Sequence, residues 1–261
     1  MNNRIRFSQF LLRLGTFIHS LPVVIMKPDD LIEFERLCYA RPGKVQSWSD
    51  DALVDSGLNS LEKKLISSAN KKDGKLLLLG VGGGREAIQF AKMGFQVKGV
   101  DFIPGMVKNA MENAIDRGVK IEGLVQEISK LDVPENSFDL VWLSKAMYSS
   151  IPSRRKRAEM LQKISGSLKP NGIFICQFRT GYQQENLGRG EKIRKAIAKS
   201  FLGNKEYELG DILWLNIEFL HLFMSENEVN SELEEAGFFV RELLLFKETY
   251  NGGVVCVKTN K

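Results

Sequence analysis

Apolar and polar positions between residues 75 and 178 alternate in a way that predicts strands and helices in turn. Five short apolar runs are strand candidates: 75–79, 96–100, 120–125, 137–143 and 172–178. Three amphipathic segments between them are helix candidates: 84–93, 105–117 and 153–168. Further on, a helix over 225–236 precedes two strand candidates, 239–246 and 253–258. We expect an α/β fold: a doubly wound, mostly parallel seven-stranded sheet with helices on both faces and an antiparallel C-terminal strand.

The first 70 residues follow another pattern and predict an N-terminal helical extension. Apolar side chains between Phe7 and Ile18 recur at steps of three, four and seven, which is typical of one face of an amphipathic helix. Three interpretations stay open for this helix: packing on the domain, a lid over a ligand pocket, or contact with a membrane surface, with Arg4, Arg6 and Arg13 near lipid phosphates. Arg13 and His19 interrupt the apolar stretch and no small-residue cleavage site follows, so neither a membrane-spanning helix nor a signal peptide is predicted.

The composition narrows the classes of protein to consider. The 261 residues include 37 Lys and Arg against 32 Asp and Glu, a net charge of +5 with the two signs interspersed. This balance does not demand an acidic partner such as nucleic acid. The three cysteines are far apart and only two histidines occur, so no disulfide framework and no metal site is predicted. A reducing, cytoplasmic location is the expectation.

The strongest local signal is a glycine cluster that follows the first strand candidate. The sequence Gly80-Val81-Gly82-Gly83-Gly84 leads straight into a helix candidate, and glycines let the backbone turn sharply and approach a ligand closely. Asp101 ends the next strand candidate, where a carboxylate can accept two hydrogen bonds from a ribose diol. Phe102 beside it offers an apolar face for an adenine ring. The loop fits both the dinucleotide pattern and the S-adenosylmethionine pattern.

Three further features favour the second pattern. The third strand ends at Glu127 and Ile128, which can meet an adenine edge; the segments 136–142 and 168–174 follow in the expected order; and the chain closes with an antiparallel pair. Together these resemble the class I, Rossmann-like S-adenosylmethionine-dependent methyltransferases over about residues 75–258. The resemblance implies S-adenosyl-L-methionine as cofactor, held by Gly80, Val81, Gly82, Gly84, Asp101, Phe102, Met106, Glu127, Ile128 and Ser144.

Two departures from that family stand out. Its members usually carry an acid two residues before the first glycine, which helps to position the methionine part of the cofactor, and here that position is Leu78. The Asn-Pro-Pro-Tyr signature of methyltransferases that act on amino groups of nucleic acid is absent, because residues 143–146 read Leu-Ser-Lys-Ala. This absence argues against DNA adenine methylation.

The groups that contact the acceptor are less well defined. Residues 1–70 are expected to act as a lid, residues 71–261 as the methyltransferase domain, and residues 180–224 within it as a substrate-covering insertion. Tyr148 and His221 are the catalytic candidates, each weighed against a purely structural role in the core. Further candidates for acceptor contact or for binding an acidic group are Lys145, Ser149, Ser150, the cations at 154–157, and the basic segment 181–201 that includes Arg189.

Methyl transfer depends mainly on orientation of the acceptor and exclusion of water, so a missing catalytic constellation does not count against it. We expect a cytoplasmic methyltransferase acting on a small molecule, with peripheral membrane contact through the N-terminal helix as one possibility. Three alternatives stay open: methylation of RNA or protein, an NAD(P)-dependent oxidoreductase, and a binding module without activity.

Overall fold

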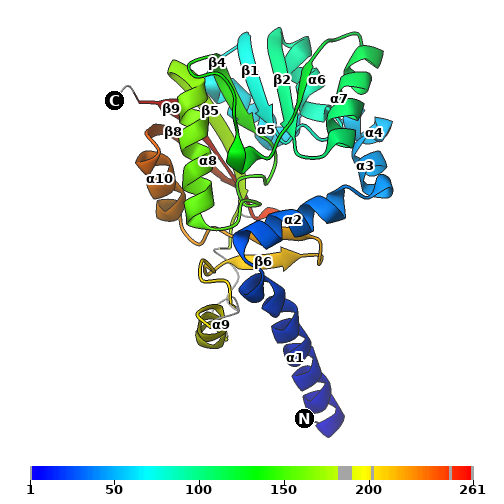
Figure 1. The fold of residues 1–261 in the computed structure, drawn as a ribbon, viewed down its shortest axis with the longest axis vertical. Helices are drawn as coiled ribbons and strands as arrows, with labels where there is room; N and C mark the ends of the chain where they lie inside the picture. Colours follow the sequence, from blue (N-terminus) through cyan, green and yellow to red (C-terminus); the bar gives the residue numbers. More distant parts are fainter. Residues whose placement is uncertain (1, 182–189, 201–202, 247–248, 260–261) are drawn as a thin grey trace.

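A seven-stranded sheet forms the centre of the computed structural model, which describes residues 2–181, 190–200, 203–246 and 249–259 (Figure 1). Its strand order is β3-β2-β1-β4-β5-β9-β8. The strands are β1 (Gly74–Leu79), β2 (Phe95–Asp101), β3 (Glu122–Val125), β4 (Phe138–Leu143), β5 (Leu168–Arg179), β8 (Phe238–Phe246) and β9 (Asn251–Lys258). The first five run parallel, and β9 is antiparallel to both β5 and β8. The predicted fold class is confirmed.

Strand β1 shows why the sheet is covered on both sides. Its four leucines are completely buried, and alternate side chains point to opposite faces. Leu76 and Leu78 belong to one apolar cluster, and Leu77 and Leu79 belong to the other. Helices α5 (Ser60–Ala69), α6 (Arg85–Lys92) and α7 (Pro104–Asp116) contribute to the first cluster, and α8 (Arg154–Ser167) and α10 (Glu226–Glu235) contribute to the second.

The N-terminal extension is helical, as its sequence predicts, but its first helix does not pack along the domain. The extension comprises α1 (Asn3–Ile25), α2 (Pro28–Tyr39), α3 (Pro42–Trp48) and α4 (Asp51–Asp55). Figure 1 shows α1 extending away from the sheet. Among the described residues its contacts lie in the C-terminal part, where Val23 and Val24 are buried against Leu31 and Phe219 and Nδ1 of His19 is 2.9 Å from Oδ1 of Asn216.

By length and composition alone, α1 is long and apolar enough to span a membrane, and most of it is exposed. The expectation that the chain has no membrane-spanning helix stays a prediction. The isolated Arg13 and His19 break the apolar run without making a 23-residue helix polar overall. A signal sequence passes the same test, so composition by itself does not assign a role to α1.

A second, two-stranded sheet lies within the segment 180–224 and was not predicted. Strands β6 (Asp211–Trp214) and β7 (Glu218–His221) pair antiparallel, and α9 (Glu191–Ala198) precedes them. Both α9 and β6 contact α1, and α2 contacts β7. The N-terminal extension and the internal segment 180–224 therefore pack on each other. Arg189 of the predicted basic segment, its end at Phe201, and residues 247–248 of the predicted turn lie outside the described residues.

Candidate functional site

The glycine loop forms a tight turn between β1 and α6 that depends on backbone conformations glycine adopts readily. Gly80 has φ +83°, and a Cβ built on it would lie 2.9 Å from Cγ of Met147. Gly84 begins α6 with φ +96° and packs against the backbone of Ala110. The loop itself is fixed to the sheet, because the amides of Gly80 and Val81 donate to the carbonyl of Val100 at 2.8 and 2.9 Å.

Asp101 ties the glycine loop to the end of β2. Its Oδ2 accepts from the amide of Gly82 at 3.1 Å, and its Oδ1 accepts from the amide of Ile103 at 3.0 Å. Burial raises the pKa of this carboxyl to about 6, and the amides oppose that rise. The carboxylate therefore lies at the carboxyl edge of the sheet, beside the loop, as a ribose-binding acid would.

A cavity that is partly open to solvent lies along this edge. Eight of the ten predicted cofactor residues line it: Gly80, Val81, Gly82, Asp101, Phe102, Met106, Ile128 and Ser144. They come from the loop, the end of β2, the start of α7, the 3-10 helix η1 (Ile128–Lys130) and the end of β4.

The other two predicted cofactor residues do not line the cavity. Gly84 is the first residue of the α6 turn and contacts α7 instead. The carboxylate of Glu127 accepts from the hydroxyl of Ser129 and pairs with Nζ of Lys130 at 3.0 Å. These contacts direct the carboxylate of Glu127 toward Ser129 and Lys130, so an adenine contact from Glu127 stays a prediction.

The cavity is also lined by residues that the sequence did not single out. Glu35 and Tyr39 come from α2, Trp48 from α3 and Glu218 from β7. Arg179 ends β5 beside them. No local motif marks these positions, because they are brought together only by the packing of the N-terminal helices on the 180–224 segment. Of the predicted acceptor contacts, Lys145 and Ser150 line the same region, whereas Ser149 does not.

Two carboxyl groups dominate the electrostatics there. Burial raises the pKa of Glu35 well above its ordinary value, and the nearby charge of Glu218 raises it further. Burial also raises the pKa of Glu218, opposed by hydrogen bonds from Tyr39 and Ser150. The backbone amide of Phe219 donates to Oε1 of Glu35 at 2.6 Å. A carboxyl group with a raised pKa is a stronger base than an ordinary carboxylate.

The two catalytic candidates lie elsewhere, and the expectation that they face the acceptor is not supported by their placement. Tyr148 is completely buried, and its hydroxyl donates to Glu232 at 2.6 Å. His221 is also completely buried, between Asp211 and Glu228. Neither lines the cavity. Both therefore fit the structural alternative that the sequence left open, in which buried polar groups are satisfied by partners in the core.

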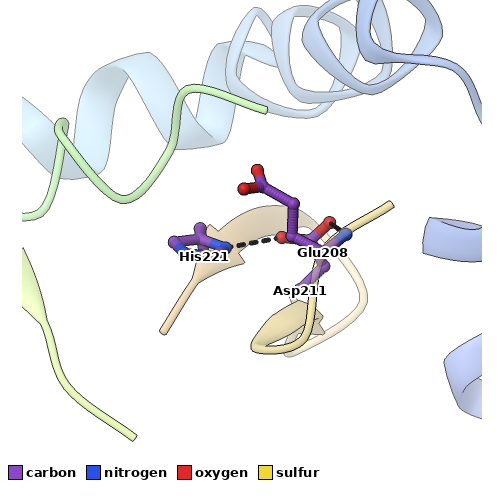
Figure 2. Close-up of side chains that lie close together, drawn as sticks. All are labelled: Glu208, Asp211 and His221. Atoms are coloured by element: carbon purple, nitrogen blue, oxygen red, sulfur yellow. Dashed lines mark hydrogen bonds and ion pairs between the residues drawn. The ribbon is translucent and has the colours of Figure 1, made fainter. Parts of the chain in front are cut away.

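Figure 2 shows His221 with two acids, Glu208 and Asp211, whose ligand atoms all lie within 4.8 Å of one another. A metal ion needs a histidine nitrogen with a free lone pair. Here Nδ1 is 2.8 Å from Asp211 and Nε2 is 3.0 Å from Glu228. Burial alone would lower the pKa of His221, but these carboxylates raise it to about 9. The cluster around His221 is therefore explained by a protonated histidine that pairs with neighbouring carboxylates.

The basic run 154–157 is also neutralised from within the chain. Arg154 pairs with Glu235 at 2.7 Å, and Lys156 pairs with Asp29 at 2.8 Å. Four more pairs involve the same run: Arg155 with Glu159, Arg155 with Glu206, Arg157 with Glu208, and Arg157 with Glu232. These contacts, rather than an acidic group on a substrate, occupy the four cations.

Comparison with known proteins agrees with this geometry. Residues 77–176 match the family described as Methyltransferase domain. Two relatives are ubiquinone biosynthesis O-methyltransferases. The one from Paramagnetospirillum magneticum is 31% identical over 64% of this chain and 60% of its own, and the one from Xanthomonas axonopodis is 28% identical over 45% and 49%. The chain thus matches about half to 60% of the length of these curated relatives.

Solved structures extend the likeness to most of the chain, at the level of the fold. A SAM-dependent methyltransferase from Methanosarcina mazei has a TM-score of 0.62 and 21% identity, over 78% of this chain and 100% of its own. The 1,6-didemethyltoxoflavin-N1-methyltransferase of Burkholderia thailandensis, solved with its substrate and S-adenosylhomocysteine, has a TM-score of 0.62 and 17% identity, over 90% and 92%. Residues 77–176 therefore match a methyltransferase domain, and the strand order and the loop–Asp101 geometry agree with the fold of the S-adenosylmethionine-dependent methyltransferases.

Proposed function

We propose that the protein transfers a methyl group from S-adenosylmethionine to a hydroxyl group of a small molecule. The observation that carries this proposal is a pair of carboxyl groups, the buried Glu35 and the half-buried Glu218, that line the same cavity as Asp101. A hydroxyl acceptor has to lose its proton during transfer, so it benefits from a nearby base, whereas a neutral amine does not need one before it reacts.

The cofactor, when bound, supplies an electrophilic methyl group whose reactivity is its own. The chain's part is to hold the acceptor in line and to exclude water. Helices α2 and α3 place Tyr39 and Trp48 over the cavity, and Nζ of Lys145 lies 5.0 Å from the centre of the Trp48 ring. Glu218 is the base in this scheme, and its carboxylate accepts the hydroxyl proton.

Two observations support a small acceptor over a macromolecule. Residues of α2, α3 and β7 line the cavity together with residues of the sheet edge, so an acceptor there would lie between the N-terminal helices and the sheet. The cations of the basic run 154–157, which would otherwise suit a nucleic-acid backbone, are paired with acids of the chain. The names of two relatives, which are O-methyltransferases, point to the same acceptor atom.

The test is a transfer assay with methyl-labelled S-adenosylmethionine and a panel of phenols, catechols, aliphatic alcohols, amines, RNA and protein. We expect label on a hydroxyl-bearing small molecule. Glu218→Gln should lower kcat at least tenfold with S-adenosylhomocysteine affinity unchanged. Label only on amines, RNA or protein would refute the proposed acceptor, and full activity of Glu218→Gln would refute the base.

Helix α1 favours a second element of the proposal, contact with a membrane surface. Eight large apolar residues of α1 are each at least 42% exposed: Ile5, Phe7, Phe10, Leu11, Leu12, Leu14, Ile18 and Ile25. Arg4, Arg6 and Arg13 on the same helix suit anionic headgroups. Because the anchored end of α1 leads into α2, which lines the acceptor end, such contact would bring the cavity close to an apolar acceptor dissolved in the membrane.

A further inference from the structure

Leu78 leaves the cofactor site without the acid that its family usually places on the first strand. The side chain is completely buried and packs in the apolar cluster on the α6 side of the sheet. In the register of β1 with β4, Leu78 is paired with Trp142. No polar group of β1 is therefore available where the methionine part of the cofactor is expected.

A different acid reaches this place from the first turn of α6. Glu86 is 4% exposed, yet it is one of the residues that line the cavity. Its Oε1 accepts from Nε1 of Trp142 at 3.3 Å, and its Oε2 accepts from the hydroxyl of Ser144. Both donors belong to β4 or to its end, directly beside β1. The carboxylate of Glu86 thus lies next to the strand position at which the usual acid is missing.

The charge of this carboxylate is only partly compensated inside the protein. The nearest cation is Arg85, whose Nη2 is 3.3 Å from Glu86 Oε1. Arg85 is engaged more closely by Glu62, with distances of 2.6 and 2.7 Å from its two terminal nitrogens. Burial raises the pKa of Glu86 to about 6, opposed by Arg85 and by the donors Ser144 and Trp142 and reinforced by the charge of Glu62. A cationic ligand group at this place would favour the ionised form.

We infer that Glu86 binds the α-ammonium group of the methionine part of S-adenosylmethionine, in place of the acid that β1 lacks. The inference rests on the proposed function for its cofactor and adds to it a residue outside the family's usual position. Helix α6 supplies the carboxylate, and Ser144 and Trp142 fix its orientation. Ser144 then serves two purposes, as a cavity-lining residue and as a hydrogen-bond donor that holds the anchor.

The test compares ligands that differ in the group Glu86 is expected to bind. Titration calorimetry on the full chain measures Kd for S-adenosylhomocysteine, for its analogue without the α-amino group, and for 5′-methylthioadenosine, which lacks the whole amino-acid end. We expect Glu86→Gln to weaken S-adenosylhomocysteine about tenfold or more, as for a lost hydrogen bond between charged groups, and to change the other two less than twofold. Glu86→Asp should restore part of the loss.

The outcomes separate this inference from the cofactor assignment. If the wild-type protein binds none of the three ligands, the proposed function fails and the inference with it. If the wild type binds S-adenosylhomocysteine but Glu86→Gln leaves its affinity unchanged, only the inference fails. Equal weakening of all three ligands would also overturn it, because a general loss of site structure does not depend on the ammonium group. Should Glu86→Gln not fold, Glu86→Asp against the same ligands gives the same comparison.

Discussion

The backbone of Gly83 lies directly against the backbone of Trp48, so that a Cβ at Gly83 would be 2.0 Å from the Trp48 carbonyl oxygen and 2.9 Å from the Ser49 α-carbon. The glycine loop is therefore a contact surface on two sides. Gly82 and Gly80 border the cavity, and Gly83 borders the end of α3. Position 83 requires glycine because the end of α3 packs closely on it, and not because its backbone is left-handed.

Gly83→Ala should separate the N-terminal helices from the loop. Because the clash involves backbone on both sides, it cannot be relieved by a side-chain rotation, and we expect a loss of about 1–3 kcal/mol in the free energy of unfolding. S-adenosylhomocysteine should also bind more weakly. Denaturant unfolding and calorimetry measure the two effects. Gly166→Ala in α8 is the matched control, since a Cβ there has no neighbour within 4 Å. Equal stability of the two variants would contradict the contact.

Asp101→Ala should weaken cofactor binding by about 1–3 kcal/mol, the usual range for a lost hydrogen bond to a charged group. The variant loses the predicted ribose contact and the anchor to the Gly82 amide. Asp101→Asn keeps the size of the side chain and removes only its charge, so it should fall between wild type and Asp101→Ala. Calorimetric titration with S-adenosylhomocysteine measures the series. Unchanged affinity in Asp101→Ala would rule out the ribose contact.

The pH dependence of cofactor binding follows from the same carboxyl group. The pKa of Asp101 is raised from 3.8 to about 6, so the stability it contributes to the free protein is full below pH 3.8 and is lost as the pH rises through 6. A ribose diol donates to the ionised form, so ionisation of Asp101 alone should raise cofactor affinity roughly tenfold from pH 5 to pH 7, in the direction opposite to stability. Asp101→Asn should remove this contribution in calorimetric titrations at the two pH values, and any rise that persists is expected from Glu86, whose pKa is also raised to about 6.

The sequence predicts those parts of the site whose residues lie close together along the chain, and it misses those whose residues are far apart. The loop and Asp101 belong to one strand–helix–strand unit, so their spacing along the chain already predicts that they lie side by side. Glu35 and Glu218 lie near opposite ends of the chain and meet only after α2 packs on β7. Tyr148 follows the fourth strand as the pattern requires, yet its side chain turns into the core toward Glu232. A role for Glu86 in the site could have been predicted from the sequence, because Glu86 closely follows the glycine loop.

Removal of residues 1–20 should abolish binding to anionic vesicles and leave cofactor affinity unchanged, because the buried residues of α1, Val23 and Val24, lie beyond residue 20. The sharper variant is Phe7→Glu with Phe10→Glu, which places charge among the exposed apolar positions. Ser8→Glu with Gln9→Glu adds the same charge to the same helix without removing an apolar side chain. We expect the wild type to float with phosphatidylcholine–phosphatidylglycerol vesicles. Most of this vesicle binding should remain in the Ser8→Glu, Gln9→Glu control. Vesicle binding by the truncated chain would contradict a role for α1.

The buried His221 cluster should make the folded protein sensitive to alkaline pH. Its pKa is raised from 6.5 to about 9, so its contribution to stability is full below pH 6.5 and is lost as the pH rises through 9. The loss should be on the order of 3 kcal/mol, since one pKa unit corresponds to about 1.4 kcal/mol. Denaturant unfolding between pH 6 and pH 10 measures it. His221→Gln should lack this decline, whereas His19→Gln, at an exposed histidine, should keep it.

A metal ion at the same residues predicts a different response, which makes the two interpretations separable. Zinc binding would require the ring to lose a proton and one of its two carboxylate partners, so an ion-paired cluster should not bind it. Incubation with EDTA should leave Tm unchanged, and added Zn²⁺ should not raise it. A Tm that falls with EDTA, in wild type but not in His221→Gln, would show that Glu208, Asp211 and His221 hold a metal after all. The decline in stability between pH 6 and pH 10 would then need another explanation.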